Sequence, residues 1–208
     1  GIHLHPYKGG KPADDAVLVV GAGGGKNLAP HADALAGWIK AGGHVLALGL
    51  AADEANAFLP KDVTTKRGEH IAAWFEPFGH GSPLSGVGPA DVHNAAPRKV
   101  PLLAGEAAVG NGVLGRIPGT NVLFYQFPPQ AVTEGLKGEP WTFSSTISQH
   151  NLKRTYRRAS FCLARLLAGM GVAAATPVLE RFATPVAQGP GESLAGNGDF
   201  ASDEDGDG

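Results

Sequence analysis

Two short apolar runs, each closed by a glycine, constrain the fold of this chain more than any other feature. Residues 16–20 read AVLVV and end at Gly21, and residues 44–48 read HVLAL and end at Gly49. A short, almost wholly apolar run bounded by glycines is typical of a strand buried on both faces of a parallel sheet. We therefore expect two buried parallel strands near the start of the chain.

The segment between these two runs has the pattern of a helix. Leu35, Trp38 and Ile39 recur at helical spacing within residues 31–41, and Gly42 follows as a stop. A strand, a helix and a strand within about 35 residues make a βαβ unit. The first third of the chain therefore predicts an α/β fold with a parallel pair of strands.

Further elements follow from the same reasoning. Residues 69–75 fit either a helix or a strand, and residues 76–101, broken by glycines and prolines, should be mostly loop. The clearest helix is 151–170, where apolar side chains recur at steps of three and four and Asn151 suits the N-cap. The other predicted elements are a short helix at 51–59 and strands at 102–104, 107–117 and 122–127.

These elements predict a mostly parallel sheet with helices on both faces. In such sheets ligands bind beyond the carboxyl ends of the strands. Residues 21–26 and 49–53 follow the first two strands, so they are the first places to look for chemistry.

The length of 208 residues suits one ordinary domain with an appendage. The chain opens on Gly1 and ends in an acidic stretch that stops in mid-pattern, so we expect a piece of a longer polypeptide. The predicted parts are an N-terminal loop or end of a preceding domain at 1–15, the α/β domain at 16–175, a linker at 176–196 and an acidic tail at 197–208.

Composition excludes several classes of protein. A single cysteine excludes a disulfide framework and any zinc site built from cysteines. A net charge of −2 implies neither nucleic acid nor a membrane surface, and no apolar run is long enough to span a bilayer. Cys162 lies inside the predicted helix, so we expect a buried, small apolar role for it. No cofactor is predicted.

The glycine-rich loop VGAGGGK invites a nucleotide-binding interpretation, but it fits neither the phosphate-loop pattern nor the dinucleotide pattern. A tight turn is the favoured interpretation. Backbone amides before a helix can still hold an anion. Gly23, Gly24, Gly25 and Lys26 therefore stand as candidate ligand-binding residues.

Three side chains are candidates for a cryptic catalytic site. Asp91 and His93 alternate in the string GPADVHN, and an extended segment would place them on one face. His150 is a third candidate. The favoured alternative is an Asp–His hydrogen bond that fixes the loop, because a metal would need a third ligand that the sequence does not supply.

Four cations gather in the string KRTYRR of the predicted helix. We expect Lys153, Arg154, Arg157 and Arg158 to pair with acids of the same chain or of a neighbouring domain. A solvated face and nucleic-acid binding are the less favoured interpretations, because no second basic patch accompanies this one.

The acidic tail fits the first six positions of a calcium-binding loop, with Asp203, Asp205 and Asp207 as ligands. The later positions, including the bidentate glutamate, are missing. We therefore expect a disordered tail with at most weak calcium affinity, and predict no metal site.

The order of residues 17–25, a helix and residues 43–52 resembles class I glutamine amidotransferase-like domains, whose sheet is flavodoxin-like. In that family the second strand runs into a sharp turn with a nucleophilic cysteine. The matching stretch here is LGLAA at 48–52, and Leu50 occupies the nucleophile position. The resemblance therefore implies that amidotransferase chemistry is lost.

A closer resemblance is to the catalytically silent version of this domain in large β-galactosidase-like glycoside hydrolases, the β-galactosidase trimerisation domain. The strings GEHIA at 68–72, GVGPADVHN at 86–94 and NLKRTYRRASF at 151–161 are similar to segments of such proteins. The ending GNGDF at 196–200 is similar to the opening strand of the jelly-roll modules that often follow.

This resemblance implies a non-catalytic accessory domain, structural or at an interface, of a multidomain carbohydrate-active enzyme. Its partners would be other domains of the same polypeptide, and a homo-oligomer and a carbohydrate ligand stay open. The resemblance also implies a periplasmic or secreted home. The alternatives are a sugar-binding module or a hydrolase with a cryptic site around Asp91 and His93.

Overall fold

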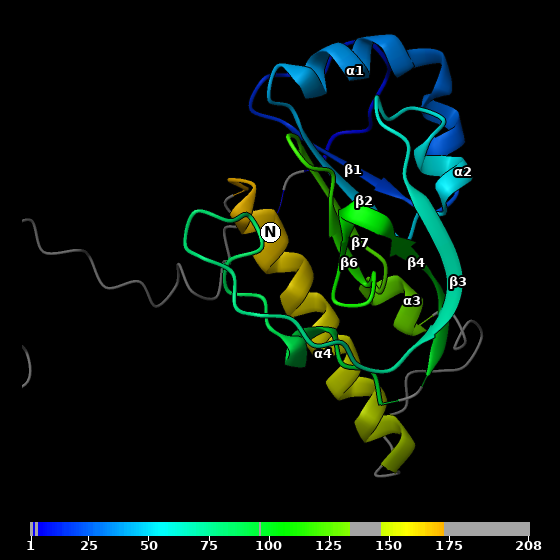
Figure 1. Ribbon diagram of the computed structural model, residues 1–208, viewed down its shortest axis with the longest axis vertical. Helices are drawn as coiled ribbons and strands as arrows, with labels where there is room; N and C mark the ends of the chain where they lie inside the picture. Colours follow the sequence, from blue (N-terminus) through cyan, green and yellow to red (C-terminus); the bar gives the residue numbers. More distant parts are fainter. Residues whose placement is uncertain (1, 3, 96, 134–146, 173–208) are drawn as a thin grey trace, which may run out of the picture. The chain divides into compact units, whose positions relative to one another are not determined.

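The computed structural model describes residues 2, 4–95, 97–133 and 147–172 (Figure 1). These residues belong to one compact unit, Ile2–Ala174. Its strands are β1 (Val17–Gly21), β2 (His44–Leu48), β3 (Thr64–His70), β4 (Arg98–Ala104), β5 (Ala108–Val109), β6 (Leu114–Arg116) and β7 (Asn121–Tyr125). Its α-helices are α1 (Ala32–Lys40), α2 (Ala52–Ala55), α3 (Pro129–Thr133) and α4 (Ile147–Gly169), with 3-10 helices η1 (Gly25–His31), η2 (Pro89–Val92) and η3 (Gly105–Ala107).

The main sheet has five strands in the order β1-β2-β7-β6-β5. β1, β2 and β7 are parallel, and they are the apolar runs that the sequence predicts as strands. β6 and β5 join the β7 edge in antiparallel fashion, because the chain returns through tight turns between them. The predicted α/β class is confirmed, and the sheet is mixed.

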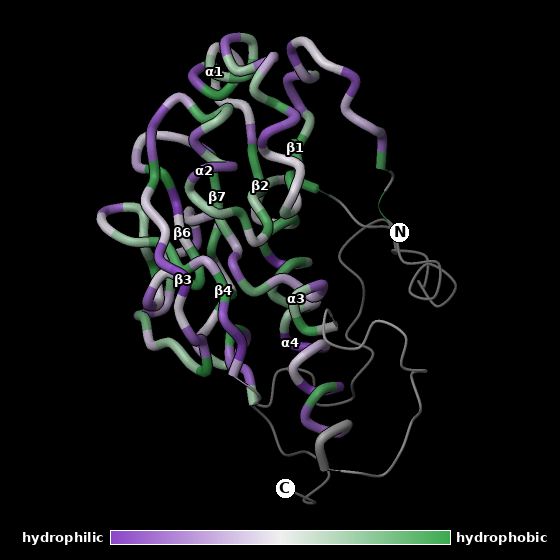
Figure 2. The backbone as a smooth tube through the Cα atoms, turned by 90° about the vertical axis from the view of Figure 1, so that its right-hand side faces the viewer, coloured by the Kyte–Doolittle hydropathy of each residue, from purple (hydrophilic) through white to green (hydrophobic). Residues whose placement is uncertain are grey.

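A separate ribbon of two antiparallel strands, β3 and β4, accompanies the main sheet. Its pairing runs from Thr64 opposite Ala104 to His70 opposite Arg98. Figure 2 shows hydrophilic stretches along both strands. The apolar pattern therefore indicates only the end of β4, which contains the strand predicted at 102–104. β4 begins inside the segment 76–101 that was expected to be mostly loop, and of residues 69–75 only the first two belong to a strand.

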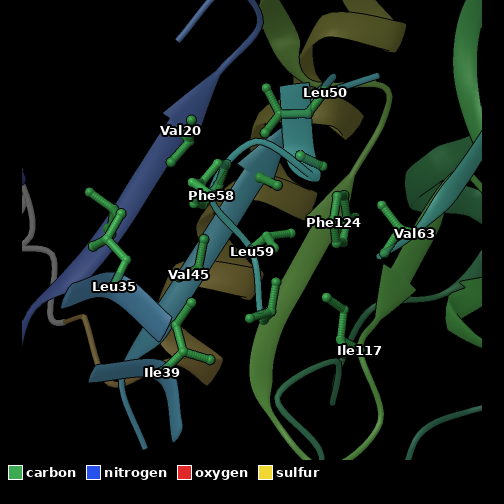
Figure 3. Close-up of a cluster of buried hydrophobic side chains, with 14 of the residues drawn as sticks. Val20, Leu35, Ile39, Val45, Leu50, Phe58, Leu59, Val63, Ile117 and Phe124 are labelled. Carbon is green, nitrogen blue, oxygen red and sulfur yellow. The ribbon is translucent and has the colours of Figure 1, made fainter. Parts of the chain in front are cut away.

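Side chains of the central strands alternate between two apolar clusters, one on each face of the sheet. Val45 and Ala47 of β2 pack on the side of α1, whereas Leu46 and Leu48 pack on the side of α4. Figure 3 shows the first cluster, which contains Val20 of β1, Val45 of β2 and Phe124 of β7 together with Leu35 and Ile39 of α1. Helices therefore cover both faces of the sheet, as predicted.

The long helix α4 supplies the second cluster with a stripe of buried residues, Ala159, Cys162 and Leu166, and Met170 extends the stripe just after the helix ends. It begins at Ile147, so the prediction that Asn151 is its N-cap was wrong. No glycine or proline separates residues 147–150 from the helix, so nothing in the sequence stops it from starting a turn earlier. None of the helices in the described ranges combines the length and the apolar character needed to cross a membrane.

Candidate functional site

A cavity of about 750 Å³ opens at the carboxyl edge of the parallel strands. Its volume falls within the range of ligand sites, roughly 300–1,000 Å³. The ends of β1, β2 and β7 form one side, and the β3–β4 ribbon forms another. The polar side chains that line it are Glu54, Thr65, Arg67, Lys99, Gln126 and Gln130. The position agrees with the expectation that ligands bind beyond strand ends.

The chain turns sharply between β2 and α2, in the stretch 48–52 where the sequence resemblance would place a nucleophile. Gly49 makes the turn with φ +68°, and its amide donates to the carbonyl of Tyr125 at 3.0 Å. The next residue, Leu50, has an exposed fraction of 0% and packs in the α1 cluster. A buried aliphatic side chain supplies neither a nucleophile nor a proton, so Leu50 cannot act as either.

Gln126, directly after β7, is the one buried amide on the wall of the cavity. Its side-chain Nε2 donates to the carbonyl of Leu50 at 2.9 Å, which fixes the orientation of the amide. Its Oε1 is buried and accepts no hydrogen bond from any residue that the structure describes. A buried acceptor left unpaired costs about 1–3 kcal/mol, so this oxygen calls for a donor from outside the described residues.

The glycine-rich loop after β1 is held by α2. The amide of Gly23 donates to the carboxylate of Glu54, and the amide of Gly24 donates to the carbonyl of Gly21 at 2.9 Å. A Cβ on Gly25 would lie 2.5 Å from the carbonyl oxygen of Glu54. The loop is thus a tight turn packed on its neighbour, and the amides of Gly23 and Gly24 already have acceptors.

Lys26, the fourth candidate in that loop, forms an ion pair with Asp53 of α2 at 2.7 Å. The hydrogen bond from Lys26 lowers the pKa of Asp53, and the same bond raises the pKa of Lys26. Both groups are exposed, so the pair adds little stability. The charge that a bound anion would need is therefore already matched within the chain.

The β3–β4 ribbon contributes two cations to the cavity. Arg67 and Lys99 line it together with Thr65 and Pro101, which the pairing register places on the same face of the ribbon. The side chains of Arg67 and Lys99 form no ion pair with any described residue. The hydroxyl of Thr65 accepts from the amide of Ala52, so the ribbon is also tied to the start of α2.

The three candidate catalytic residues have separate structural roles. Asp91 accepts from the amide of Gly88 at 2.8 Å and caps η2. The Nδ1 of His93 accepts from Arg158 at 2.9 Å. His150 is exposed in the first turn of α4. The Asp91 and His93 side chains thus fix the loop through different partners, and none of the three lines the strand-end cavity.

The four cations of the basic stretch of α4 differ in their contacts and in their exposure. Arg158 points to the loop of His93, so one of the four predicted interface cations serves within the chain. Arg154 and Arg157 are exposed, and Lys153 is half-buried. The candidate calcium ligands Asp203, Asp205 and Asp207 lie outside the described residues, and within those residues no three His, Cys, Asp or Glu side chains gather in a metal-binding arrangement.

Cys162 has the buried role predicted for it. Its exposed fraction is 0%, and burial raises the pKa of its thiol to about 12. Burial also raises the pKa of the neighbouring Tyr125, whose hydroxyl donates to the carbonyl of Ala159 at 3.5 Å. A thiol held protonated in this way is not a nucleophile at neutral pH.

No family model, no curated protein and no solved structure matches this chain. The strand-end residues Arg67, Lys99 and Gln126 were missed by sequence reasoning. Gln126 offered one signal, because it is a lone amide in the apolar run VLFYQF, whereas Arg67 and Lys99 lie in the region where hydrophobic periodicity fails.

Proposed function

We propose that this chain is a non-catalytic accessory domain of a multidomain carbohydrate-active enzyme, of the β-galactosidase-like kind. One observation carries the proposal. Leu50 sits fully buried in the turn where the amidotransferase-like fold would hold its nucleophile. The finer assignment of the sheet as flavodoxin-like belongs to the same proposal, and the βαβ unit from β1 to β2 supports it.

The exposed surface supports a role in contacts with other domains. Trp74 has an exposed fraction of 72%, and Ile71 and Phe161 are exposed by about half. Large apolar side chains and arginines are enriched at protein interfaces. In this proposal the exposed cations Arg154 and Arg157 of α4 contact acids of a neighbouring domain or of a second copy of the chain.

Charge reversal tests the interface. Arg154→Glu with Arg157→Glu should weaken assembly of the longer polypeptide, measured by light scattering after size-exclusion chromatography. The melting temperature of the isolated chain should stay unchanged, because both side chains are exposed. Lys40→Glu, at the exposed end of α1, is the matched control and should leave assembly intact. Equal effects of the two changes would contradict the proposal.

The main competitor is an enzyme with a cryptic site at Asp91, His93 and His150. It predicts turnover of a glycoside or an ester by the wild-type chain, abolished by Asp91→Ala without loss of the fold. Such turnover would overturn the non-catalytic assignment. A sugar-binding module is the second candidate, and the strand-end cavity is the observation that favours it.

A further inference from the structure

We propose that the strand-end cavity is a binding site for a small hydroxylated carboxylate, such as a sugar acid. Arg67 and Lys99 would hold the carboxylate, and the Oε1 of Gln126 would accept a hydrogen bond from a hydroxyl. The inference goes beyond the accessory role and does not depend on it, because a domain can bind such a ligand whether or not it serves an interface.

The two cations give the site its preference for an anion. Arg67 and Lys99 share one face of the ribbon and line the cavity without an ion pair to any described residue. By contrast, Lys26 and Lys61 pair with Asp53 and Glu106. Glu69 lies opposite Lys99 in the register but is not within ion-pair distance. Guanidinium and carboxylate groups match in a bidentate fashion, which favours a carboxylate at Arg67.

The acceptors on the other side of the cavity call for hydroxyl donors. The Oε1 of Gln126 cannot turn away, because its Nε2 is committed to the carbonyl of Leu50. Glu54 accepts from the amide of Gly23 through one oxygen, which leaves the second as a further acceptor. A ligand with a carboxylate alone would leave these oxygens unpaired, whereas a hydroxylated ligand donates to them.

Charge and shape narrow the ligand class further. The lining of the cavity contains two cations, Arg67 and Lys99, and one anion, Glu54, so its net charge is +1. This charge matches a monoanion better than a dianionic phosphate ester. Pro101 and Pro128 supply an apolar part of the wall that suits the C–H face of a sugar ring. The volume of about 750 Å³ admits a monosaccharide acid.

Isothermal titration calorimetry of the whole chain with three matched probes tests the ligand class. D-galacturonate carries both the carboxylate and the hydroxyls, D-galactose lacks the carboxylate, and cyclohexanecarboxylate lacks the hydroxyls. We expect galacturonate to bind at least about tenfold more tightly than either of the others, since one charge-assisted hydrogen bond accounts for such a factor. No heat with millimolar galacturonate, or equal affinity for galactose, would overturn the proposal.

Variants on the ribbon test the location. Arg67→Ala and Lys99→Ala should each weaken galacturonate binding by about tenfold or more. Lys66→Ala is the matched control, because it removes the same charge from the opposite face of β3. Gln126→Leu removes the acceptor for the ligand hydroxyl, so it should weaken galacturonate binding. The affinity for galacturonate should then be closer to the affinity for cyclohexanecarboxylate. Binding that survives Arg67→Ala, or that Lys66→Ala weakens equally, would place the ligand elsewhere and refute the site.

The two proposals fail in different experiments. Loss of galacturonate binding in the calorimeter leaves the interface test of Arg154 and Arg157 untouched. Likewise, normal assembly of the charge-reversal variant leaves the cavity variants informative, because Arg67 and Lys99 lie on the ribbon and not on α4.

Discussion

His70 is the side chain whose titration should be visible in the stability of the domain. Its exposed fraction is 2%, and its Nε2 donates to the carbonyl of Val92. The ring also packs against Phe127, with 5.6 Å between ring centroids. Burial lowers the pKa of His70 below its usual value, because an imidazolium would lose its hydration at this site. The fold therefore holds a neutral imidazole.

The sign of the pH dependence follows from that shift. Above about pH 7.5 the histidine is neutral in both states, so its titration does not change the free energy of unfolding. As the pH falls below about 6.5, the unfolded chain takes up a proton that the folded chain refuses. Stability is then lost at up to about 1.4 kcal/mol per pH unit, until the pH reaches the lowered pKa of the folded state.

Urea unfolding at several pH values measures this loss, with tryptophan fluorescence as the probe, because unfolding exposes the buried Trp38. In His70→Gln the amide can still donate to Val92 but does not titrate. The stability advantage of the wild type over this variant should shrink as the pH falls from about 7.5 to about 5.5. His80→Gln, which changes an exposed histidine, is the control and should follow the wild type. Parallel curves for wild type and His70→Gln would refute the reasoning.

Four further predictions concern packing and the thiol. Leu35→Ala should cost about 3–5 kcal/mol by urea unfolding, because Leu35 is fully buried between α1 and the sheet; a cost below about 1 kcal/mol would contradict the packing. Gly25→Ala should lower the free energy of unfolding by about 1–3 kcal/mol, because the new Cβ would meet the backbone of Glu54. Gly37→Ala, in an open position of α1, should raise the free energy of unfolding by about 0.5–1 kcal/mol in the same assay. Cys162 should resist Ellman's reagent until the chain unfolds, since burial raises its pKa to about 12; rapid labelling of the native protein would show that the thiol is reachable.

The sequence pattern was sufficient to predict those strands and helices whose burial is visible within the segment itself. The runs at β2 and β7 are buried on both faces, so nearly all of their residues had to be apolar. β1 lies at the edge of the sheet and keeps Val19 exposed, although its sequence is apolar as well. The buried stripe of α4 could be predicted because its apolar residues recur at helical spacing, although the start of the helix could not. The burial of Cys162 follows from its place on that stripe.

Pattern failed at β3 and at the start of β4, because buried and exposed residues do not alternate along either strand. The pairing partner of each strand also lies more than twenty residues away in the chain. It also failed to show that Asp91 and His93 have different partners, since Gly88 is local but Arg158 comes from a distant helix. Nothing in the string GPADVHN could indicate that partner.

The sequence by itself determined the α/β class, the βαβ unit and the buried stripe of α4, because hydrophobic periodicity is a property of a single segment. Only the tertiary structure decided the chemistry of the strand ends. It placed Glu54 against the glycine loop, and it brought Arg67 and Lys99 of the ribbon to the same cavity as Gln126. These side chains are far apart in the chain, and only the packing of the ribbon beside the sheet makes them neighbours.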